Sequence, residues 1–349
     1  MSETAMAPGM TVLTGGSGWF GRCYLATLTK TAISDAYAHQ VRVLVQHPAQ
    51  QDVVRRVAPH ARVVVGDVAD PVVLRELMDG AAGAQVVHAA GVIHPRRYAD
   101  FEHVNVQGTR AVLAAARAAG IARLVYLSSN APFGRNSYPE DTFRHEEPYR
   151  PYLGYGASKM RAEIAVRQAH DASGLETVVL RPPWFYGEEQ PMRQTRFLTL
   201  CRRGHFPLIS DGHTRRSMVY IGNLVDAVQL AQQHRKAAGG AYWVADARPY
   251  TLAEIIITVR QALREEGYPV SPYQFRIPRV AATLAGRADR ALQATGCYHP
   301  QIHMLGELNH TIACDISQTT ADLAYQPRVA LLEGMRRAIR WCRTHYVNL

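Results

Sequence analysis

The fold is decided near the N-terminus by residues 11–21, which read Thr-Val-Leu-Thr-Gly-Gly-Ser-Gly-Trp-Phe-Gly. The apolar run predicts a strand, and the glycines at 15, 18 and 21 predict a turn that opens a helix. Gly15 permits the tight turn, Gly18 lets the backbone approach a pyrophosphate, and Gly21 allows close helix-strand packing. Amides at the N-terminus of the helix then bind that anion. The stretch therefore predicts a dinucleotide-binding unit.

Four more apolar runs follow, at residues 41–45, 63–65, 85–88 and 124–127, separated by segments with helical periodicity such as 72–78 and 109–119. Val- and Leu-rich strands that alternate with helices are typical of a parallel sheet covered on both faces. Right-handed crossovers then predict an α/β fold with a Rossmann-type doubly wound sheet, whose ligand crevice lies at the carboxyl ends of the strands.

The residue that follows the second strand bears on the choice of cofactor. A carboxylate there favours NAD and an arginine favours NADP, but the sequence has Gln46. Because no carboxylate repels a 2′-phosphate and Arg55 and Arg56 lie downstream, we lean slightly to NADP over NAD. The alternative for the two arginines is a pair of solvated helix charges.

Small and polar residues at the ends of the third and fourth strands extend the predicted cofactor site. Asp67 is placed to accept a hydrogen bond from the adenine amine, and Asp70 to cap the helix that starts near Pro71. Residues 89–91, Ala-Ala-Gly, let a cofactor lie flat against the backbone. His88 is given no chemical role.

Tyr155 and Lys159 lie four residues apart and therefore on one face of a predicted helix. A nearby ammonium favours the phenolate and lowers the pKa of a tyrosine below its usual ~10. Such a tyrosine exchanges a proton with an alcohol or ketone near neutral pH. Ser129, at the carboxyl end of the fifth strand, is placed to hydrogen-bond the reacting oxygen. Ser129, Tyr155 and Lys159 are the predicted catalytic residues.

These motifs occur in an order that resembles the extended short-chain dehydrogenase/reductase superfamily, the NAD-dependent epimerase/dehydratase family. Residues 220–223, Tyr-Ile-Gly-Asn, are similar to its 3β-hydroxysteroid dehydrogenase-like branch. The resemblance implies that Lys159 holds the nicotinamide ribose and that a homodimer forms through the helices containing Tyr155 and following Asn105. The expected cofactor-binding residues are Gly15, Ser17, Gly18, Trp19, Phe20, Gln46, Asp67, Val68, Ala89, Ala90, Gly91, Leu127, Tyr155, Lys159, Pro182 and Pro183.

The predicted function is an NAD(P)-dependent oxidoreductase that interconverts a ketone and a secondary alcohol. Its small-molecule substrate is expected to be fairly large and partly apolar, steroid-like or polyketide-like. Two alternatives stay open: a sugar-nucleotide epimerase or reductase, because Arg216 resembles the arginine that holds a diphosphate in such enzymes, and a non-catalytic NAD(P)-binding regulator. The expected substrate residues are Asn130, Trp184, Phe185 and Arg216.

Three regions are expected along the chain. Residues 1–187 form the dinucleotide-binding domain with the catalytic helix. Residues 188–310 form mainly a smaller substrate lobe, from which 217–246 return to the first domain, and 311–349 form a C-terminal strand and helix segment. Within the lobe, residues 276–294 are rich in Ala, Leu and Arg with helical spacing. We interpret them as a packed amphipathic helix, with a helix on a membrane surface as the alternative.

Composition bears on the kinds of partner and on the cellular location that are expected for the protein. The formal charge is +10, from 39 Lys and Arg against 29 Asp and Glu, but the arginines are scattered, which argues against nucleic-acid binding. No apolar stretch approaches the ~20 residues of a membrane span, and the N-terminus lacks a secretory signal. The five cysteines are isolated, without metal-ligand spacing. We expect reduced thiols, no metal and a cytoplasmic location.

Overall fold

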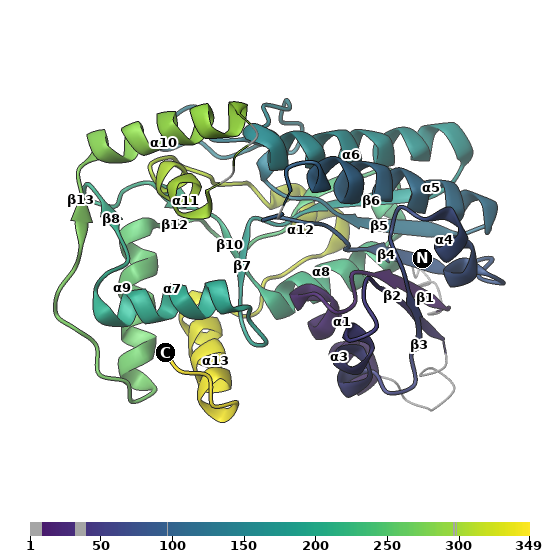
Figure 1. The fold of residues 1–349 in the computed structure, drawn as a ribbon, viewed down its shortest axis with the longest axis horizontal. Helices are drawn as coiled ribbons and strands as arrows, with labels where there is room; N and C mark the ends of the chain where they lie inside the picture. Colours follow the sequence, from purple (N-terminus) through teal and green to yellow (C-terminus); the bar gives the residue numbers. More distant parts are fainter. Residues whose placement is uncertain (1–8, 32–39, 96, 296, 298) are drawn as a thin grey trace.

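The computed structural model describes residues 9–31, 40–95, 97–295, 297 and 299–349, and its core is a seven-stranded sheet (Figure 1). The strand order is β11-β6-β5-β4-β1-β2-β3, and every neighbouring pair is parallel. The predicted doubly wound parallel sheet is therefore confirmed. The strands are β1 Thr11–Thr14, β2 Val41–Val45, β3 Arg62–Val65, β4 Gln85–His88, β5 Arg123–Leu127, β6 Glu176–Arg181 and β11 Ala241–Trp243.

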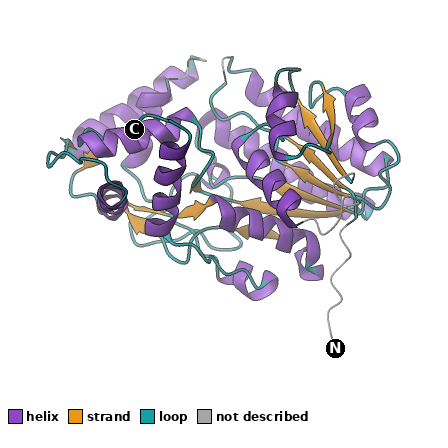
Figure 2. Ribbon diagram, turned by 90° about the horizontal axis from the view of Figure 1, so that it is seen from below, coloured by secondary structure: helices purple, strands orange, loops and turns teal. Residues whose placement is uncertain are grey.

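Alternation along the strands gives the sheet two apolar faces, and helices lie on both sides of it (Figure 2). Leu13 and Val87 pack on one side against α1, α3 and α8, whereas Val12 and Val86 pack on the other against α4, α5 and α6. Each helix thus buries an apolar stripe against the sheet. Their bounds are α1 Trp19–Thr31, α3 Gln50–Val57, α4 Pro71–Met78, α5 Gly108–Ala118, α6 Leu153–Ser173 and α8 Ile221–Gln233.

The position of β1 sets the ligand crevice. β1 lies between β4 and β2, so the chain winds outward in opposite directions from this point. In such sheets the crevice opens at the carboxyl ends of the strands, beside the point where the winding direction changes.

The predicted cap at Asp70 is present at the N-terminus of α4, since its carboxylate accepts a hydrogen bond from the Val72 amide at 2.8 Å.

A smaller lobe, at the left of Figure 1, is built from helices and short strand pairs. Its strands pair as β7 with β10, β9 with β12 and β8 with β13. The elements are β7 Trp184–Tyr186, α7 Met192–Arg203, β8 Leu208–Ile209, β9 Arg215–Arg216, β10 Met218–Tyr220, β12 Tyr250–Thr251, α9 Leu252–Glu265, β13 Arg276–Ile277, α10 Arg279–Ala294 and α11 Pro300–Leu308. Shorter connecting elements are η1 Phe101–Gln107, η2 Ala131–Phe133, η3 Arg235–Ala237 and α12 Ser317–Leu323.

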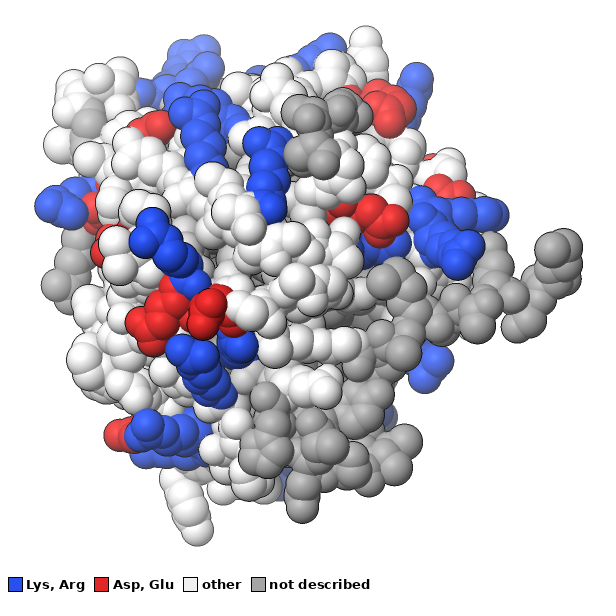
Figure 3. Space-filling model, turned by 90° about the vertical axis from the view of Figure 1, so that its right-hand side faces the viewer, with Lys and Arg blue, Asp and Glu red and all other residues white. Residues whose placement is uncertain are grey.

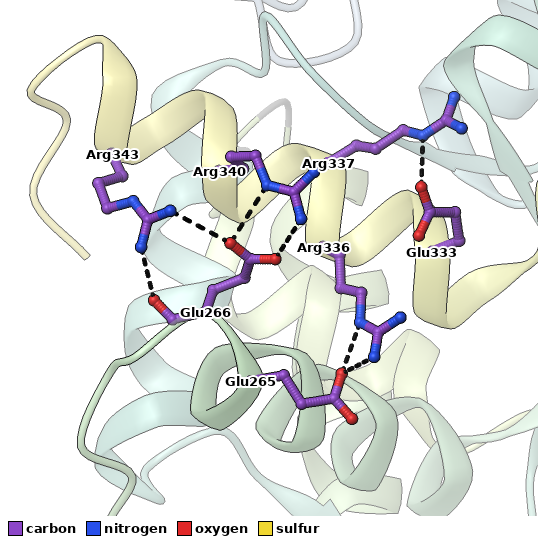
Figure 4. A network of polar contacts seen from close by, with 7 residues as sticks. All are labelled: Glu265, Glu266, Glu333, Arg336, Arg337, Arg340 and Arg343. Atoms are coloured by element: carbon purple, nitrogen blue, oxygen red, sulfur yellow. Dashed lines mark hydrogen bonds and ion pairs between the residues drawn. The ribbon is translucent and has the colours of Figure 1, made fainter.

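The last helix, α13 Leu331–Thr344, joins the lobe through an ionic network (Figure 4). Glu266, at the end of α9, is 8 % exposed, and its carboxylate forms ion pairs with the guanidiniums of Arg340 at 2.7 Å and Arg343 at 3.4 Å. Arg336 pairs with Glu265 in the same interface. A carboxylate shared by two guanidiniums at a largely buried position fixes the helix more firmly than isolated surface pairs do.

The described residues contain no helix that is both long and apolar enough to cross a membrane. All five cysteines are free. Within the same part of the chain, no three His, Cys, Asp or Glu side chains converge in a way that would hold a metal ion.

Candidate active site

The glycine turn lies directly against the end of β4. Gly15 has φ +77°, and a Cβ there would come within 2.7 Å of the Ala90 nitrogen. A Cβ on Gly21 would lie 2.4 Å from the Gly15 carbonyl oxygen, so only glycine fits either position. Gly18 is exposed at the N-terminus of α1, where backbone N–H groups lack intrahelical partners. This cradle fits the pyrophosphate of a dinucleotide.

The two aromatic residues after Gly18 use their side chains within the protein. Phe20 is buried and stacks on Tyr24 with ring centroids 5.6 Å apart. Trp19 packs on Phe185 at 4.9 Å, and its Nε1 donates to the Glu188 carbonyl at 2.6 Å. Trp19 and Phe20 are therefore placed to contribute backbone amides to a cofactor, while Phe185 covers the start of α1.

A salt bridge that the sequence did not reveal joins the glycine turn to the loop after β7. Arg22 donates from Nη1 to the Ser17 carbonyl at 2.8 Å and from Nε to the Glu189 carboxylate at 2.9 Å. The carbonyl of Ser17 is thus held from inside the protein. This leaves the Ser17 amide and hydroxyl as its groups for the predicted ligand contact.

At the predicted adenine end, Asp67 already has two partners. Its Oδ1 accepts from the Ala69 amide at 2.8 Å, and its Oδ2 lies 2.7 Å from His103 Nε2. Burial alone raises the pKa of Asp67, but these hydrogen bonds outweigh it and leave the pKa below its usual value. His103 lies on η1, which is a π-helix, and sequence reasoning missed it. Val68 faces inward against Gly108.

The segment after β2 makes local contacts. The amides of Gln46 and His47 both donate to the Gln50 side chain, at 2.9 and 3.0 Å. Arg55 hydrogen-bonds Gln51 at 3.0 Å, and its guanidinium lies 3.7 Å from Asp52 on the same helix. For Arg55, these contacts favour a solvated helix charge over a 2′-phosphate ligand.

His88 links two strands and a helix. Its Nδ1 is 2.7 Å from Thr14 Oγ1 on β1, and its Nε2 is 3.0 Å from Thr109 Oγ1 on α5. Burial, together with the Lys159 ammonium, lowers the pKa of His88 to about 3. A neutral imidazole bonded on both nitrogens has a structural role, in agreement with the sequence analysis.

This buried imidazole makes stability depend on acidity. An unfolded histidine titrates near pH ~6.5, so between that value and about 3 the unfolded state binds the extra proton. The contribution of His88 is expected to be full above pH ~6.5 and to fall by up to about 1.4 kcal/mol per pH unit on acidification. Urea unfolding of the wild type and His88→Gln between about pH 7 and about pH 5 measures it. Equal slopes in the two proteins would contradict the assignment.

The three predicted catalytic residues converge beyond β5. Lys159 is buried on α6, donates to the Leu127 carbonyl at 2.6 Å and lies 4.3 Å from the centre of the Tyr126 ring. Burial lowers the pKa of Lys159 to about 7. Tyr155 is half-buried one turn earlier on α6, and Ser129 lies close enough to act on its phenol.

The expected acidification of Tyr155 needs correction. Burial raises its pKa, and the interactions that oppose this rise come from the Ser129 hydroxyl and the Arg193 charge. The desolvation cost of a phenolate outweighs both. In this structure burial therefore raises the pKa of Tyr155, whereas the sequence predicted that Lys159 would lower it.

A buried polar chain holds the start of the catalytic helix. Asn105, on η1, donates to the Val92 carbonyl at 3.0 Å and to Ser158 Oγ at 2.9 Å. Ser158 Oγ in turn donates to the Tyr155 carbonyl at 2.8 Å. π-Helical turns are found frequently at functional sites, and this one presents Asn105 to α6.

An ion pair that sequence reasoning missed lies one turn beyond Lys159. Glu163 is 0 % exposed and accepts from Arg181 at 2.6 Å, Ser128 at 2.5 Å and Tyr149 at 3.0 Å. It joins the end of β6 to α6 directly behind the site. The only signal in the sequence is an acidic residue four positions after Lys159, which is ordinary on a helix.

The predicted substrate residues are dispersed. Asn130 lies beside Ser129, whose Oγ donates to it at 3.4 Å. Trp184 donates to Gln194 at 3.1 Å and belongs to the packing between β7 and α7. Arg216 is 6 % exposed; it donates to the Glu307 carbonyl, and its Nη1 lies 3.9 Å from the Glu307 carboxylate. Of the other predicted cofactor residues, Ala89 and Ala90 are half-buried, Gly91 is exposed, and Pro182 and Pro183 are buried.

Comparison with known proteins places this site in context. Residues 11–245 match the NAD dependent epimerase/dehydratase family. The uncharacterised protein y4nL of Sinorhizobium fredii is 42 % identical over 97 % of this chain and 96 % of its own length. A 4-hydroxy-2-methyl-3-oxo-4-farnesyl-3,4-dihydroquinoline-1-oxide ketoreductase of Stigmatella aurantiaca is 31 % identical over 93 % of this chain and 94 % of its own. A ceramide reductase of Caulobacter vibrioides is 30 % identical over 97 % and 95 %.

The fold is also found in solved structures. The dTDP-glucose 4,6-dehydratase DesIV of Streptomyces venezuelae, crystallised with NAD and TYD bound, superposes with a TM-score of 0.73. The match covers 96 % of this chain and 97 % of that chain at 22 % identity. Similarity at this identity supports the common fold.

Proposed function

Because the chain belongs to the NAD-dependent epimerase/dehydratase family, we propose that this enzyme uses NAD or NADP to reduce a ketone to a secondary alcohol on a large, partly apolar substrate. The observation that carries the proposal is the meeting of Ser129, Tyr155 and Lys159 beyond the end of β5. A phenol that carries its proton can donate it to a carbonyl oxygen, as reduction of a ketone requires.

The residues divide the work in the following way. When bound, a nicotinamide cofactor supplies the hydride. The turn from Gly15 to Gly21 holds its pyrophosphate, and Lys159 is assigned to its nicotinamide ribose. Tyr155 donates its phenolic proton to the substrate oxygen, and Ser129 donates a second hydrogen bond to that atom. Tyr155 and Ser129 therefore orient the carbonyl and neutralise the charge that develops on it.

The substrate class is supported by the names of the relatives and by the burial and contacts of Arg216. Two of the relatives are named for substrates with a long hydrocarbon chain: one substrate carries a farnesyl group, and the other is a ceramide. Arg216, the residue that motivated a sugar-nucleotide substrate, is buried and engaged by Glu307. We therefore assign a substrate with a long apolar chain, and keep the sugar-nucleotide epimerase as the second candidate because Arg216 Nε lacks a partner among the described residues.

For the cofactor, the lean to NADP rests on the segment after β2. Gln46 and His47 follow this strand, and the first carboxylate beyond them, Asp52, lies near Arg55 on α3. No acidic side chain of the described segment 46–51 is therefore placed to bind the ribose hydroxyls of NAD. Titration with NADH and NADPH, followed by protein fluorescence, decides between them.

Turnover of a homologous series of ketones tests the proposal. The series keeps one head group and lengthens the alkyl chain, and reduced cofactor consumption is followed by absorbance. We expect kcat/KM to rise with each added methylene, by up to about fourfold, until the apolar site is filled. A rate independent of chain length would contradict the substrate class. Epimerisation of a nucleotide sugar without net cofactor consumption would replace the proposal with the second candidate.

A further inference from the structure

Helix α10 packs on the protein along one side, as expected of an amphipathic helix, and leaves its other side exposed. It packs closely on α11, where a Cβ on Gly306 would lie 2.8 Å from the Gly286 Cα. Its buried residues are Ala282, Asp289 and Gln293. On the opposite side Val280 is 71 % exposed and Leu284 is 57 % exposed. Figure 1 shows the helix at the outer edge of the molecule.

The exposed residues of α10 form one continuous face. At 3.6 residues per turn, Val280, Leu284, Arg287 and Ala291 follow one another along the helix, and all are exposed. Arg279 and Arg290 flank this row and are also exposed. The face therefore presents aliphatic side chains beside guanidiniums; helices at a lipid-water interface place the first kind of group toward the acyl chains and the second toward the headgroups.

The exposed charged side chains of α10 itself are all arginines. Residues 267–306 include four arginines, Arg276, Arg279, Arg287 and Arg290, with no lysine and with Asp289 as the one acidic residue. All four arginines are exposed. Asp289 is 0 % exposed and accepts hydrogen bonds from inside the protein, so it does not offset them. Figure 3 shows a different surface, on which Lys and Arg side chains lie beside Asp and Glu side chains.

The inner side of α10 reaches the catalytic helix. Asp289 accepts from the Tyr152 hydroxyl at 3.0 Å, and it lies 2.8 Å from His303 Nδ1 on α11. Tyr152 directly precedes α6 and lies three residues before Tyr155. A surface that bound to the outer side of α10 would therefore be separated from the start of the helix that carries Tyr155 by α10 itself.

We propose that the exposed face of α10, formed by Val280, Leu284, Arg287 and Ala291 with Arg279 and Arg290 at its flank, binds the surface of an anionic lipid bilayer. The arginines meet the headgroup charge, each strengthening binding about fivefold, and the aliphatic side chains enter the boundary with the acyl chains. The small apolar area makes the attachment reversible and dependent on anionic lipid. This inference goes beyond the proposed ketone reduction and does not require it.

Co-sedimentation of the full chain with lipid vesicles tests the proposal. We expect binding to phosphatidylcholine vesicles that contain phosphatidylglycerol, little binding to phosphatidylcholine alone, and loss of binding at high salt. Val280→Gln with Leu284→Gln should weaken binding roughly tenfold or more. Replacing Arg279, Arg287 and Arg290 together by Gln should weaken it about a hundredfold.

Matched controls separate this face from general surface effects. Val72→Gln with Ile257→Gln changes side chains that are 64 % and 65 % exposed on α4 and α9. Arg75, Arg203 and Arg264, exposed on three other helices, are replaced together by Gln to match the change in charge. Both controls should bind vesicles as the wild type does, and thermal unfolding confirms that every variant is folded.

Two results would overturn the proposal. One is equal vesicle binding by the α10 variants and their controls. The other is a wild type that does not bind anionic vesicles. If, in that second case, the Val280→Gln with Leu284→Gln variant also changes from dimer to monomer in light scattering, the face is assigned to a second copy of the chain instead.

Discussion

Tyr155→Phe is expected to lower kcat for ketone reduction by about 10²–10⁴-fold, the usual contribution of a positioned general acid. The substitution removes the phenolic proton and retains the ring, which packs on Phe101 at 6.0 Å. Cofactor affinity and the free energy of unfolding should therefore change little. Steady-state kinetics with saturating cofactor, together with fluorescence titration of the cofactor, separate the chemical step from binding.

Tyr98→Phe is the matched control for this experiment. The ring of Tyr98 also packs on Phe101, at 5.5 Å, but its hydroxyl has no role in the proposed chemistry. It should keep nearly wild-type kcat. A Tyr155→Phe enzyme that retained more than about a tenth of the wild-type kcat would contradict the role of Tyr155 as proton donor.

Glu163→Gln is expected to lower the free energy of unfolding by about 3–5 kcal/mol, because it leaves the Arg181 guanidinium buried without its counter-charge. Arg181 is 2 % exposed and Glu163 is 0 % exposed, and their closest atoms lie 2.6 Å apart. Glutamine keeps the size of the side chain, so the loss reports on charge. Urea denaturation with a linear extrapolation measures it.

Glu102→Gln provides the control. Glu102, on η1, pairs at the surface with Arg161, which lies on α6 as Glu163 does, and the closest atoms of this pair are 2.7 Å apart. The free energy of unfolding of Glu102→Gln should fall by only about 0–1 kcal/mol. A second variant, Glu163→Leu with Arg181→Met, removes both charges and should recover much of the stability. Equal losses for Glu163→Gln and Glu102→Gln would show that burial of Arg181 does not make this pair special.

The sheet was predictable because its strands are short, continuous apolar runs separated by helical periodicity. The glycines at 15 and 21 were equally informative, because the structure has no room for a Cβ at either position. The four-residue spacing predicted that Tyr155 and Lys159 share one face of a helix. The pattern of strands and helices is local information, because neighbouring residues in the chain carry it.

The contacts that sequence reasoning missed join distant segments. Asp67 meets His103 across 36 positions, and Arg181 meets Glu163 from a strand that follows the helix. The pKa of Tyr155 was expected to fall because one neighbour was considered, but burial by the whole surrounding structure raises it. The exposure of α10 likewise depends on what lies opposite the helix, which periodicity does not reveal.

The most direct measurement of the central claim uses reduced cofactor that carries deuterium at both hydrogen positions of C4 of the nicotinamide. The full chain is incubated with this cofactor and a long-chain ketone, and the product is examined by mass spectrometry. We predict deuterium on the carbon that bears the new hydroxyl, and almost no product with Tyr155→Phe. An unlabelled alcohol, or labelled alcohol formed equally well by Tyr155→Phe, would contradict the account.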